Sequence, residues 1–172
     1  MYLVKAPFFL KLFYPKSIWN KSRKENKIYL TFDDGPIPEL TPFVLDTLKE
    51  YNIKATFFCV GENIKKNPHL FERILLEGHQ VGNHTYNHLK GWQTTDAHYL
   101  ENIEKCQELT KSNLFRPPYG RAKKSQLAKL YPDYQIIMWD VLTGDFDLSL
   151  SLEKCYKNVI NHIEIGSIIV FD

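Results

Sequence analysis

Residues 27–36 read Lys-Ile-Tyr-Leu-Thr-Phe-Asp-Asp-Gly-Pro (KIYLTFDDGP), an apolar run that changes abruptly to acidic and turn-forming residues. The run at 27–32 predicts a short buried strand that ends at the turn 34–36. Thr41 and Pro42 then predict a helix start, with Thr41 as N-cap and Pro42 at the first helical position. We expect further strands at 53–60, 79–82, 113–116, 134–139 and 167–171, and helices at 41–51, 68–77, 95–110, 122–131 and 151–163. This alternation is typical of βα units and predicts an α/β fold with a parallel sheet curled into a barrel-like form.

Acidic, imidazole and guanidinium side chains recur directly after the predicted strands. In chain order they are Asp33 and Asp34, His84, Arg116, Asp140 and Asp145, and Asp172. The carboxyl ends of parallel strands meet at one edge of a sheet or barrel, where ligands and catalytic groups gather. We therefore expect these side chains to lie near one site.

The segment His84-Thr85-Tyr86-Asn87-His88 places two histidines at positions i and i+4. On a helical turn this spacing puts both imidazoles on one face, close enough to bind one cation. A pair of surface or capping histidines is the alternative. The preceding Gly82-Asn83 turn and the strand-end position favour a metal site.

Asp33 and Asp34 cannot face the same way in an extended chain, but at a strand end one can coordinate a metal while the other hydrogen-bonds its water. A turn with Asx capping is the alternative. Unpaired charge at the end of an apolar strand is costly, which favours a functional role. With the two histidines, the pair offers three metal ligands and a base, as a hydrolytic zinc site requires.

The segment Arg116-Pro117-Pro118-Tyr119-Gly120 supplies a further set of groups. The prolines stiffen the loop and direct Arg116, which can orient a carboxylate through a bidentate contact. Pro118 has no N–H, so the Tyr119 N–H is the first one free to point into the site and bind a developing oxyanion. Taken alone, this segment would be interpreted as a turn.

In this order and at strand ends, TFDDGP (31–36), HTYNH (84–88) and RPPYG (116–120) resemble the first three motifs of the polysaccharide deacetylases with the NodB-type fold, carbohydrate esterase family 4. The resemblance runs from about residue 27 to residue 172. It implies a distorted (β/α)-barrel, here without the family's last βα segment. It also implies hydrolysis of N-acetyl groups on an N-acetylglucosamine-containing glycan, a chitin-type oligomer or peptidoglycan, with release of acetate.

The resemblance also implies roles for individual residues. Asp33 would be the catalytic base, and Arg116 would orient it. The Tyr119 N–H would help to stabilise the oxyanion. The implied metal ligands, usually for Zn²⁺ or another divalent transition metal, are Asp34, His84 and His88.

Two later motifs depart from the family pattern. In the fourth, Leu142 stands in place of an Asp and Phe146 in place of a Trp, while Asp145 is present. Phe146 can still line an apolar pocket for the acetyl methyl group, and either Asp145 or Asp140 can face the site.

The fifth motif of the family has a His that protonates the departing amine, whereas residues 168–172 read Ile-Ile-Val-Phe-Asp. We favour a truncated or altered form of a longer enzyme and expect the barrel to be open beside its last strand. The alternatives are another proton donor, or a catalytically impaired carbohydrate- or metal-binding protein on the same scaffold.

The composition indicates one globular domain. The chain has 172 residues, 44% of them hydrophobic, and a net charge of +2, which favours neither nucleic acid nor anionic membranes as partners. We expect residues 1–26, an aromatic and basic segment, to pack on a catalytic domain at 27–172; adsorption to a membrane surface is the alternative. The segment fits neither a signal peptide nor a membrane span. The three cysteines show no metal or disulfide spacing and favour a cytoplasmic location, while a cell-wall substrate would favour the envelope.

Overall fold

A single parallel sheet organises the protein, for which a computed structural model describes residues 3–172. Its seven strands follow the order β5-β4-β3-β2-β1-β7-β6, and every pairing between them is parallel. The strands are β1 (Tyr29–Asp33), β2 (Thr56–Cys59), β3 (Gln80–Asn83), β4 (Leu114–Phe115), β5 (Gln135–Ile136), β6 (Val141–Leu142) and β7 (Ile168–Phe171).

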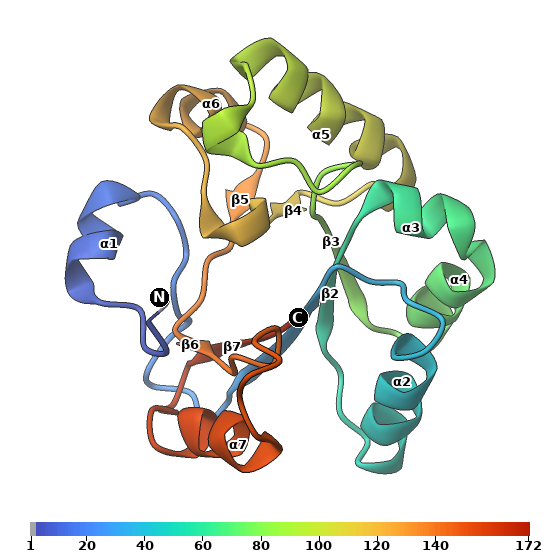
Figure 1. Cartoon of the computed structure of the whole chain (residues 1–172), viewed down its shortest axis with the longest axis vertical. Helices are drawn as coiled ribbons and strands as arrows, with labels where there is room; N and C mark the ends of the chain where they lie inside the picture. Colours follow the sequence, from blue (N-terminus) through green and yellow to red (C-terminus); the bar gives the residue numbers. More distant parts are fainter. Residues whose placement is uncertain (1–2) are drawn as a thin grey trace.

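The helices lie outside the curled sheet (Figure 1). They are α1 (Phe8–Phe13), α2 (Thr41–Glu50), α3 (Gly61–Lys66), α4 (Pro68–Leu76), α5 (Asp96–Thr110), α6 (Lys124–Leu130) and α7 (Leu152–Ile160), with short 3₁₀ turns η1 (Gly91–Gln93) and η2 (Pro118–Gly120). None of the helices within residues 3–172 combines the length and apolar character that a membrane crossing requires.

The predicted elements are confirmed in type and order, with differences in detail. The short helices α1 and α3 and the two-residue strand β6 were not predicted, because none of them is long enough to show a hydrophobic period. The assignment of Thr41 as N-cap was wrong. Thr41 is the first residue of α2, Leu40 precedes it, and the Thr41 Oγ1 accepts the Ile37 N–H instead.

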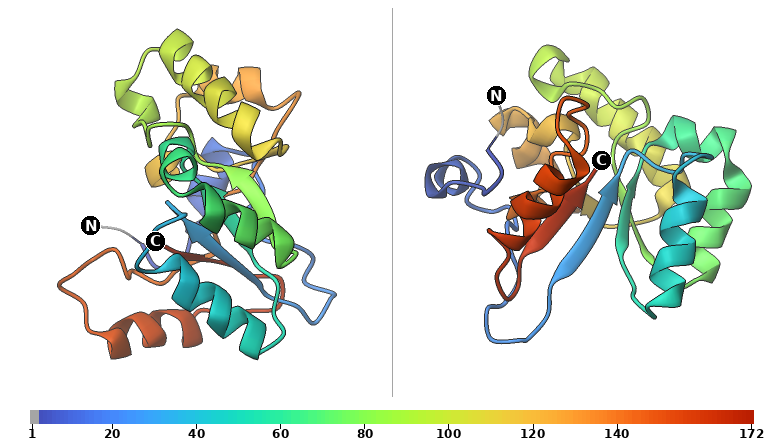
Figure 2. Two further views of the ribbon diagram at one scale, coloured as in Figure 1. Left: turned by 90° about the vertical axis from the view of Figure 1, so that its right-hand side faces the viewer. Right: turned by 60° about the horizontal axis from the view of Figure 1, so that its bottom comes forward.

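The last strand, β7, is not an edge strand of the sheet. β7 lies between β1 and β6 and pairs with both, so the expected opening beside it was wrong. In the right-hand view of Figure 2, β1 and β7 run side by side.

The curl is instead incomplete between β5 and β6, where the N-terminal segment crosses. Ile18 forms a parallel bridge to Ile137 next to β5, and Lys5 forms an antiparallel bridge to Val141 of β6. Met1 and Tyr2 lie outside the described residues.

Apolar residues from the N-terminal segment enter the core. Ala6, Tyr14 and Trp19 are buried in a cluster with Tyr99 of α5 and Phe115 of β4. A second cluster, which includes Leu45, Phe57 and Ile74, lies between β1–β3 and the helices α2 and α4. The two clusters hold the strands in register, so the residues that follow β1, β3 and β4 reach one end of the barrel.

Candidate active site

Asp33, the last residue of β1, is buried and held by a buried arginine. The Arg116 Nη1 donates to the Asp33 Oδ1 at 2.6 Å. The rest of the guanidinium is equally constrained, since it donates to the Thr31 Oγ1 and to the carbonyls of Ile137 and Met138. The contact with Asp33 is therefore one hydrogen bond, not the bidentate pair that the sequence suggested. Arg116 orients one oxygen of Asp33 and leaves the other free.

Asp34, His84 and His88 bring one carboxylate and two imidazoles together. Their potential ligand atoms all lie within 4.8 Å of one another. The Asp34 Oδ1 is 3.0 Å from the His88 Nε2 and 3.5 Å from the His84 Nε2. Among residues 3–172 this oxygen has no hydrogen bond of regular geometry, although it is buried. A buried, unpaired carboxylate oxygen facing two imidazole nitrogens fits a divalent cation.

The protonation of His84 suits a metal ligand. Its Nδ1 lies 2.8 Å from the Arg116 carbonyl oxygen, which can only accept, so the proton is on Nδ1 and the Nε2 lone pair faces the site. Burial lowers the pKa of His84, and the nearby aspartates offset this only in part. Burial alone would raise the pKa of Asp34, but the imidazoles of His88 and His84 outweigh it and hold that pKa below its usual value. The triad thus offers a carboxylate and a neutral imidazole near neutral pH.

The two histidines do not lie on a helical turn, contrary to the sequence-based interpretation. Residues 84–88 form an irregular loop in which Thr85 (φ 63°) and His88 (φ 53°) are left-handed. Asp34 (φ 70°) and Tyr119 (φ 59°) share this conformation, which is unfavourable for residues other than glycine and is concentrated at functional sites. The loop, and not helical spacing, brings the imidazoles together.

Asparagines that the sequence analysis missed hold these loops. The Asn102 Oδ1, on α5, accepts the N–H groups of Tyr86 and Asn87 at 2.8 and 3.0 Å, and its Nδ2 donates to the Asn87 Oδ1. The Asn63 Nδ2, on α3, donates to the Asp34 carbonyl at 2.7 Å. Asn102 is buried beside Ile103, and its polar side chain on the buried face of an amphipathic helix is the sequence signal that could have identified it.

The loop 116–120 makes a tight turn, in which Tyr119 and Gly120 are both left-handed. Gly120 has φ +62°, and an added Cβ would lie 2.2 Å from the Trp139 ring, so only glycine fits. The Tyr119 N–H donates no hydrogen bond to any described residue, whereas the following Gly120 N–H donates to the Pro117 carbonyl. The Tyr119 ring lies 4.7 Å from the His88 ring. A free N–H therefore sits next to the metal-binding loop.

The carboxylates of Asp140 and Asp145 lie in different parts of the structure. Asp140 is fully buried away from the site, where it accepts from Ser167, Lys5 and Arg23. The Asp145 Oδ1 accepts from the Thr143 Oγ1 and from the Asp172 N–H at 3.2 Å. Between the two candidates, Asp145 is the one connected to the site.

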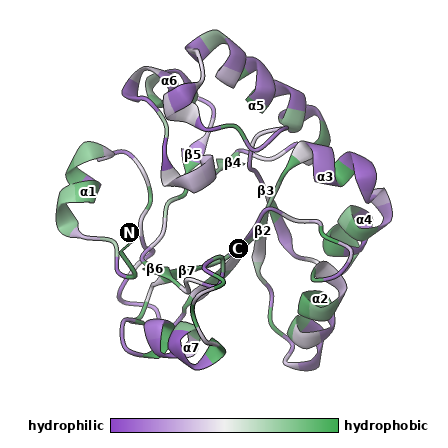
Figure 3. Cartoon of the chain, in the orientation of Figure 1, coloured by the Kyte–Doolittle hydropathy of each residue, from purple (hydrophilic) through white to green (hydrophobic). Residues whose placement is uncertain are grey.

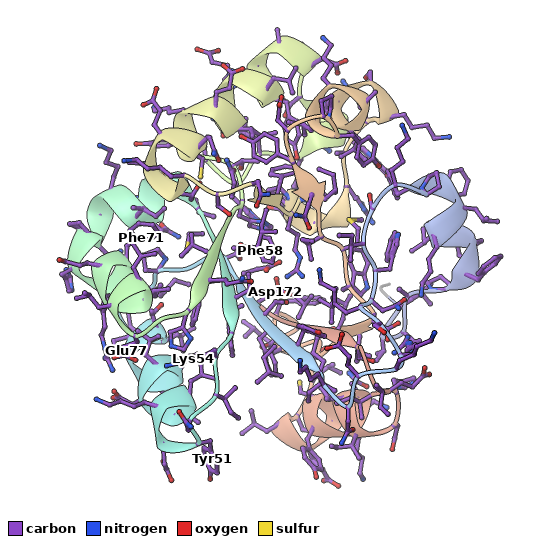
Figure 4. The ribbon with its side chains drawn as sticks, turned by 180° about the vertical axis from the view of Figure 1, so that it is seen from behind. Tyr51, Lys54, Phe58, Phe71, Glu77 and Asp172 are labelled. Carbon is purple, nitrogen blue, oxygen red and sulfur yellow. The ribbon has the colours of Figure 1, made fainter. Side chains whose placement is uncertain are left out.

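A cavity of about 670 Å³ includes Asp33, the metal triad, Arg116, Tyr119 and Asp172 in its wall. In the view of Figure 4, the labels of Asp172 and Phe58 lie near the middle of the molecule, while those of Tyr51, Lys54 and Glu77 lie toward its rim. Burial and the charges of Asp33, Asp34 and Asp145 raise the pKa of Asp172 to about 8, with Arg116 opposing. His84 and His88 are the only histidines among residues 3–172 that line the cavity.

Comparison with known proteins identifies the family and gives the same architecture. The family model for polysaccharide deacetylase matches residues 20–132. A peptidoglycan-N-acetylglucosamine deacetylase of Bacillus cereus is 38% identical over 151 residues, which make up 84% of this chain and 54% of that protein. The peptidoglycan-N-acetylglucosamine deacetylase PgdA of Listeria monocytogenes is 40% identical over 132 residues, 73% of this chain and 28% of PgdA.

Among solved structures, the Bc1960 peptidoglycan N-acetylglucosamine deacetylase superposes with a TM-score of 0.88 at 35% identity, covering 94% of this chain and 78% of that one. The predicted NodB-type barrel is thereby confirmed. The chain spans 54% of the length of its Bacillus cereus relative. On the match of sequence and fold together, the chain belongs to the polysaccharide deacetylases of carbohydrate esterase family 4.

Proposed function

We propose that the protein is a metal-dependent deacetylase that removes N-acetyl groups from an N-acetylglucosamine-containing glycan and releases acetate. The observation that carries this proposal is the convergence of Asp34, His84 and His88 beside Asp33, whose position Arg116 holds. Relatives named as peptidoglycan-N-acetylglucosamine deacetylases support the substrate class.

Asp34, His84 and His88 would hold the ion, Zn²⁺ or another divalent transition metal. When bound, the ion supplies Lewis acidity that polarises the acetyl carbonyl and lowers the pKa of water. The neutral Nε2 of His84 and the ionised Asp34 are ready to bind without prior loss of a proton.

Asp33 is the base in this proposal. Its Oδ1 accepts from Arg116, so the Oδ2, which lies 4.0 Å from the His84 Nε2, is the oxygen that takes the proton of the attacking water. The Tyr119 N–H, free of other partners, donates to the acetyl oxygen as negative charge develops there.

Asp172 is our candidate for the proton donor to the departing amine. Asp172 directly follows Phe171 and stands at the position where the family resemblance places a histidine. It also lines the cavity that contains Asp33. Burial and the charges of Asp33, Asp34 and Asp145 raise its pKa and favour the protonated carboxyl, while a cation bound by Asp34 would oppose that shift. Asp145 acts through Asp172, because its Oδ1 accepts the Asp172 N–H and fixes that backbone.

Acetate release from chito-oligosaccharides and peptidoglycan fragments, with added Zn²⁺, tests the proposal. We expect acetate from at least one N-acetylglucosamine-containing substrate and its loss in the presence of a chelator. Absence of acetate from the whole panel, with Zn²⁺ bound, would contradict deacetylation. Binding of these glycans without turnover would then identify the second candidate, a carbohydrate-binding protein, which the absence of a third cavity histidine among residues 3–172 favours.

A further inference from the structure

The wall of the active-site cavity contains hydrogen-bond donors that have no acceptor. Two arginines line the cavity, Arg116 and Arg121. Arg116 is bound to Asp33, whereas the Arg121 guanidinium makes no hydrogen bond or ion pair to any of residues 3–172. The Trp139 Nε1, in the same wall, is buried and also lacks an acceptor within the described part of the chain. Donors without acceptors suit a ligand group that only accepts hydrogen bonds, as a carboxylate does.

The Arg121 guanidinium is held over a fixed aromatic ring. Its Cζ lies 5.1 Å from the centroid of the Trp92 ring, which also lines the cavity. The Trp92 Nε1 donates to the Ala122 carbonyl at 3.1 Å. Gly91 packs so closely on the same loop that an added Cβ would lie 2.8 Å from the Arg121 carbonyl oxygen. The ring therefore has a set position, and its contact with the guanidinium restricts a side chain that is otherwise exposed.

Two further cations lie over aromatic rings of the same wall. The Lys90 Nζ is 5.1 Å from the centroid of the Tyr119 ring, and the Lys124 Nζ is 5.4 Å from the centroid of the Phe13 ring. Both lysines are exposed, and neither forms an ion pair with a residue that the structure describes. Together with Arg121 they place three positive charges without acidic partners beside one cavity. Such a group of charges raises the local concentration of anionic ligands.

Aromatic rings with neighbouring cations are also typical of surfaces that adsorb to anionic membranes. The helix α1 is mostly hydrophobic, as Figure 3 shows, and would suit that role. Arg121 and Trp92, however, belong to the metal-site cavity and not to α1. The carbon face of a sugar ring packs well on an aromatic ring, and a carboxylate matches the planar fork of a guanidinium. Their place in the cavity favours a glycan that carries acid groups.

We propose that Arg121 binds a carboxylate of an acidic N-acetylated glycan, so that the preferred substrate carries an acid group near the acetyl group that is removed. The inference rests on the proposed function, because it names a feature of the glycan on which the metal site would act. Arg121 is then a specificity-determining residue that takes no part in the proton transfers. Its charge also offsets those of Asp33, Asp34 and Asp172 in the same wall, which would otherwise repel an acidic substrate.

The test is a set of N-acetyl-β-D-glucosamine derivatives that carry a carboxymethyl group on O1, O3, O4 or O6, each compared with its neutral carboxamide. The members of a pair are nearly equal in size and differ in charge. We expect kcat/KM for acetate release to be about tenfold higher for at least one acid than for its amide, as a charge-assisted hydrogen bond provides. Equal kcat/KM in every pair would overturn the proposal. A larger preference for the matching phosphate esters would contradict recognition of a carboxylate.

Arg121→Gln and Lys16→Gln form a matched pair of variants, since each removes an exposed cation that lies over an aromatic ring. Lys16 is 5.8 Å from the centroid of the Tyr131 ring and does not line the cavity. Arg121→Gln should abolish the preference for the acid, mainly through KM, because the contact is the same in the ground state and the transition state. Arg121→Lys should restore part of the preference, since it returns the charge without the fork. Lys16→Gln should retain it. A preference that survives in Arg121→Gln would contradict the role of Arg121.

Failure of the proposed function gives a different result. If acids and amides release acetate at equal kcat/KM, only the role of Arg121 is refuted. If no derivative is turned over, the same pairs are titrated into the Zn²⁺-loaded protein by calorimetry. Tighter binding of an acid than of its amide, lost in Arg121→Gln, supports the acid-binding role without catalysis. Equal binding, or none, refutes it.

Vesicles of phosphatidylglycerol test the membrane as the rival occupant. We expect Arg121→Gln to sediment with these vesicles to the same extent as the wild type, because Arg121 serves the cavity. Weaker sedimentation of Arg121→Gln, together with equal kcat/KM in every acid and amide pair, would assign the cation to a membrane surface and overturn the proposal.

Discussion

Two buried aspartates lie at strand ends of the same sheet, and each contacts an arginine. Asp33 is the last residue of β1, and Asp140 directly precedes β6. Asp33 accepts from Arg116 at 2.6 Å, and Asp140 accepts from Arg23 at 2.9 Å. They differ in what surrounds the rest of the carboxylate. One oxygen of Asp33 remains beside the imidazoles, whereas Asp140 is also enclosed by Lys5 and Ser167.

The comparison shows that position at a strand end does not by itself make a carboxylate catalytic. The Asp33 carboxylate meets groups that can bind a metal and a substrate. The Asp140 carboxylate meets cations from the N-terminal segment, with side chains that are 0% exposed for Asp140 and 30% and 36% exposed for Lys5 and Arg23. The Asp33 carboxylate keeps one oxygen available to a ligand, whereas the Asp140 carboxylate fastens the segment that crosses between β5 and β6.

The largest expected difference between the two clusters is in metal binding. His84→Ala removes a ligand next to Asp33 and should lower Zn²⁺ affinity more than about 100-fold, since even outer contacts of a ligand are worth 10–100-fold. Asp140→Ala should retain Zn²⁺ affinity in the folded fraction. Calorimetric titration with Zn²⁺ measures both, and His98→Ala, on the exposed surface of α5, is the control. Equal affinity in wild type and His84→Ala would contradict the assigned triad.

The free energy of unfolding should depend more on the Asp140 cluster than on the metal-binding residues. Asp140→Ala leaves Lys5 and Arg23 without their buried partner, and breaking such a pair costs about 3–5 kcal/mol in free energy of unfolding. Because both cations remain partly hydrated, we expect about 3 kcal/mol, from the lower end of that range. Glu164→Ala removes an exposed carboxylate that contacts the same cations and should cost less than about 1 kcal/mol. Urea unfolding curves of the wild type, Asp140→Ala and Glu164→Ala measure these losses, and equal losses in the two variants would contradict the assigned ion pairs.

Substitutions of Asp172 and Asp145 should lower kcat to different extents, because only Asp172 is proposed to donate a proton. Asp172→Asn should lower kcat about 100-fold, the lower end of the effect of a general acid. In the wild type, the acid form of Asp172 is present below its pKa, so kcat should fall as the pH rises through that pKa, which a cation bound at Asp34 places below 8. This fall is the alkaline limb of the pH profile. The limb should be absent in Asp172→Asn. Asp145→Asn should reduce kcat less, because Asp145 only positions the donor.

The smallest effect is a pH dependence of stability. Burial alone would raise the pKa of Asp140, but hydrogen bonds from Ser167, Lys5 and Arg23 outweigh it and lower that pKa below 3.8. A lowered folded-state pKa gives stability that is present above the unfolded value and lost as the pH falls through the folded one. The stability gap between wild type and Asp140→Ala should therefore be constant above about pH 4 and shrink below it. A gap that grows in acid would contradict the assigned ion pairs.

The sequence predicted that Asp34, His84, His88 and Arg116 meet near Asp33, because short motifs at strand ends specify chemical groups directly. It did not predict the loop conformations, since left-handed residues such as Thr85 and His88 leave no periodic signal. Asn63 and Asn102 were missed because they act through backbone groups distant in the sequence. The choice between Asp140 and Asp145 depended on where Lys5 and Arg23 fold back, more than 100 residues along the chain.

The division at residue 26 stays a prediction, while Ala6, Tyr14 and Trp19 are buried with residues from 99 onward. Long-range packing of this kind is invisible to local patterns. The apolar character of the N-terminal segment was evident in the sequence, but its place between β5 and β6 followed only from the backbone bridges.

The most direct test of the account is acetate release by the wild type and Asp33→Asn, with bound Zn²⁺ quantified in the same samples. Asn keeps an oxygen for Arg116 but cannot take a proton. We predict about one Zn²⁺ per chain in both proteins, as the three-ligand site implies, and acetate release that is about 10²–10⁴-fold lower in Asp33→Asn. Acetate release by Asp33→Asn at the wild-type rate, with Zn²⁺ bound, would contradict the role assigned to Asp33 and with it the proposed chemistry.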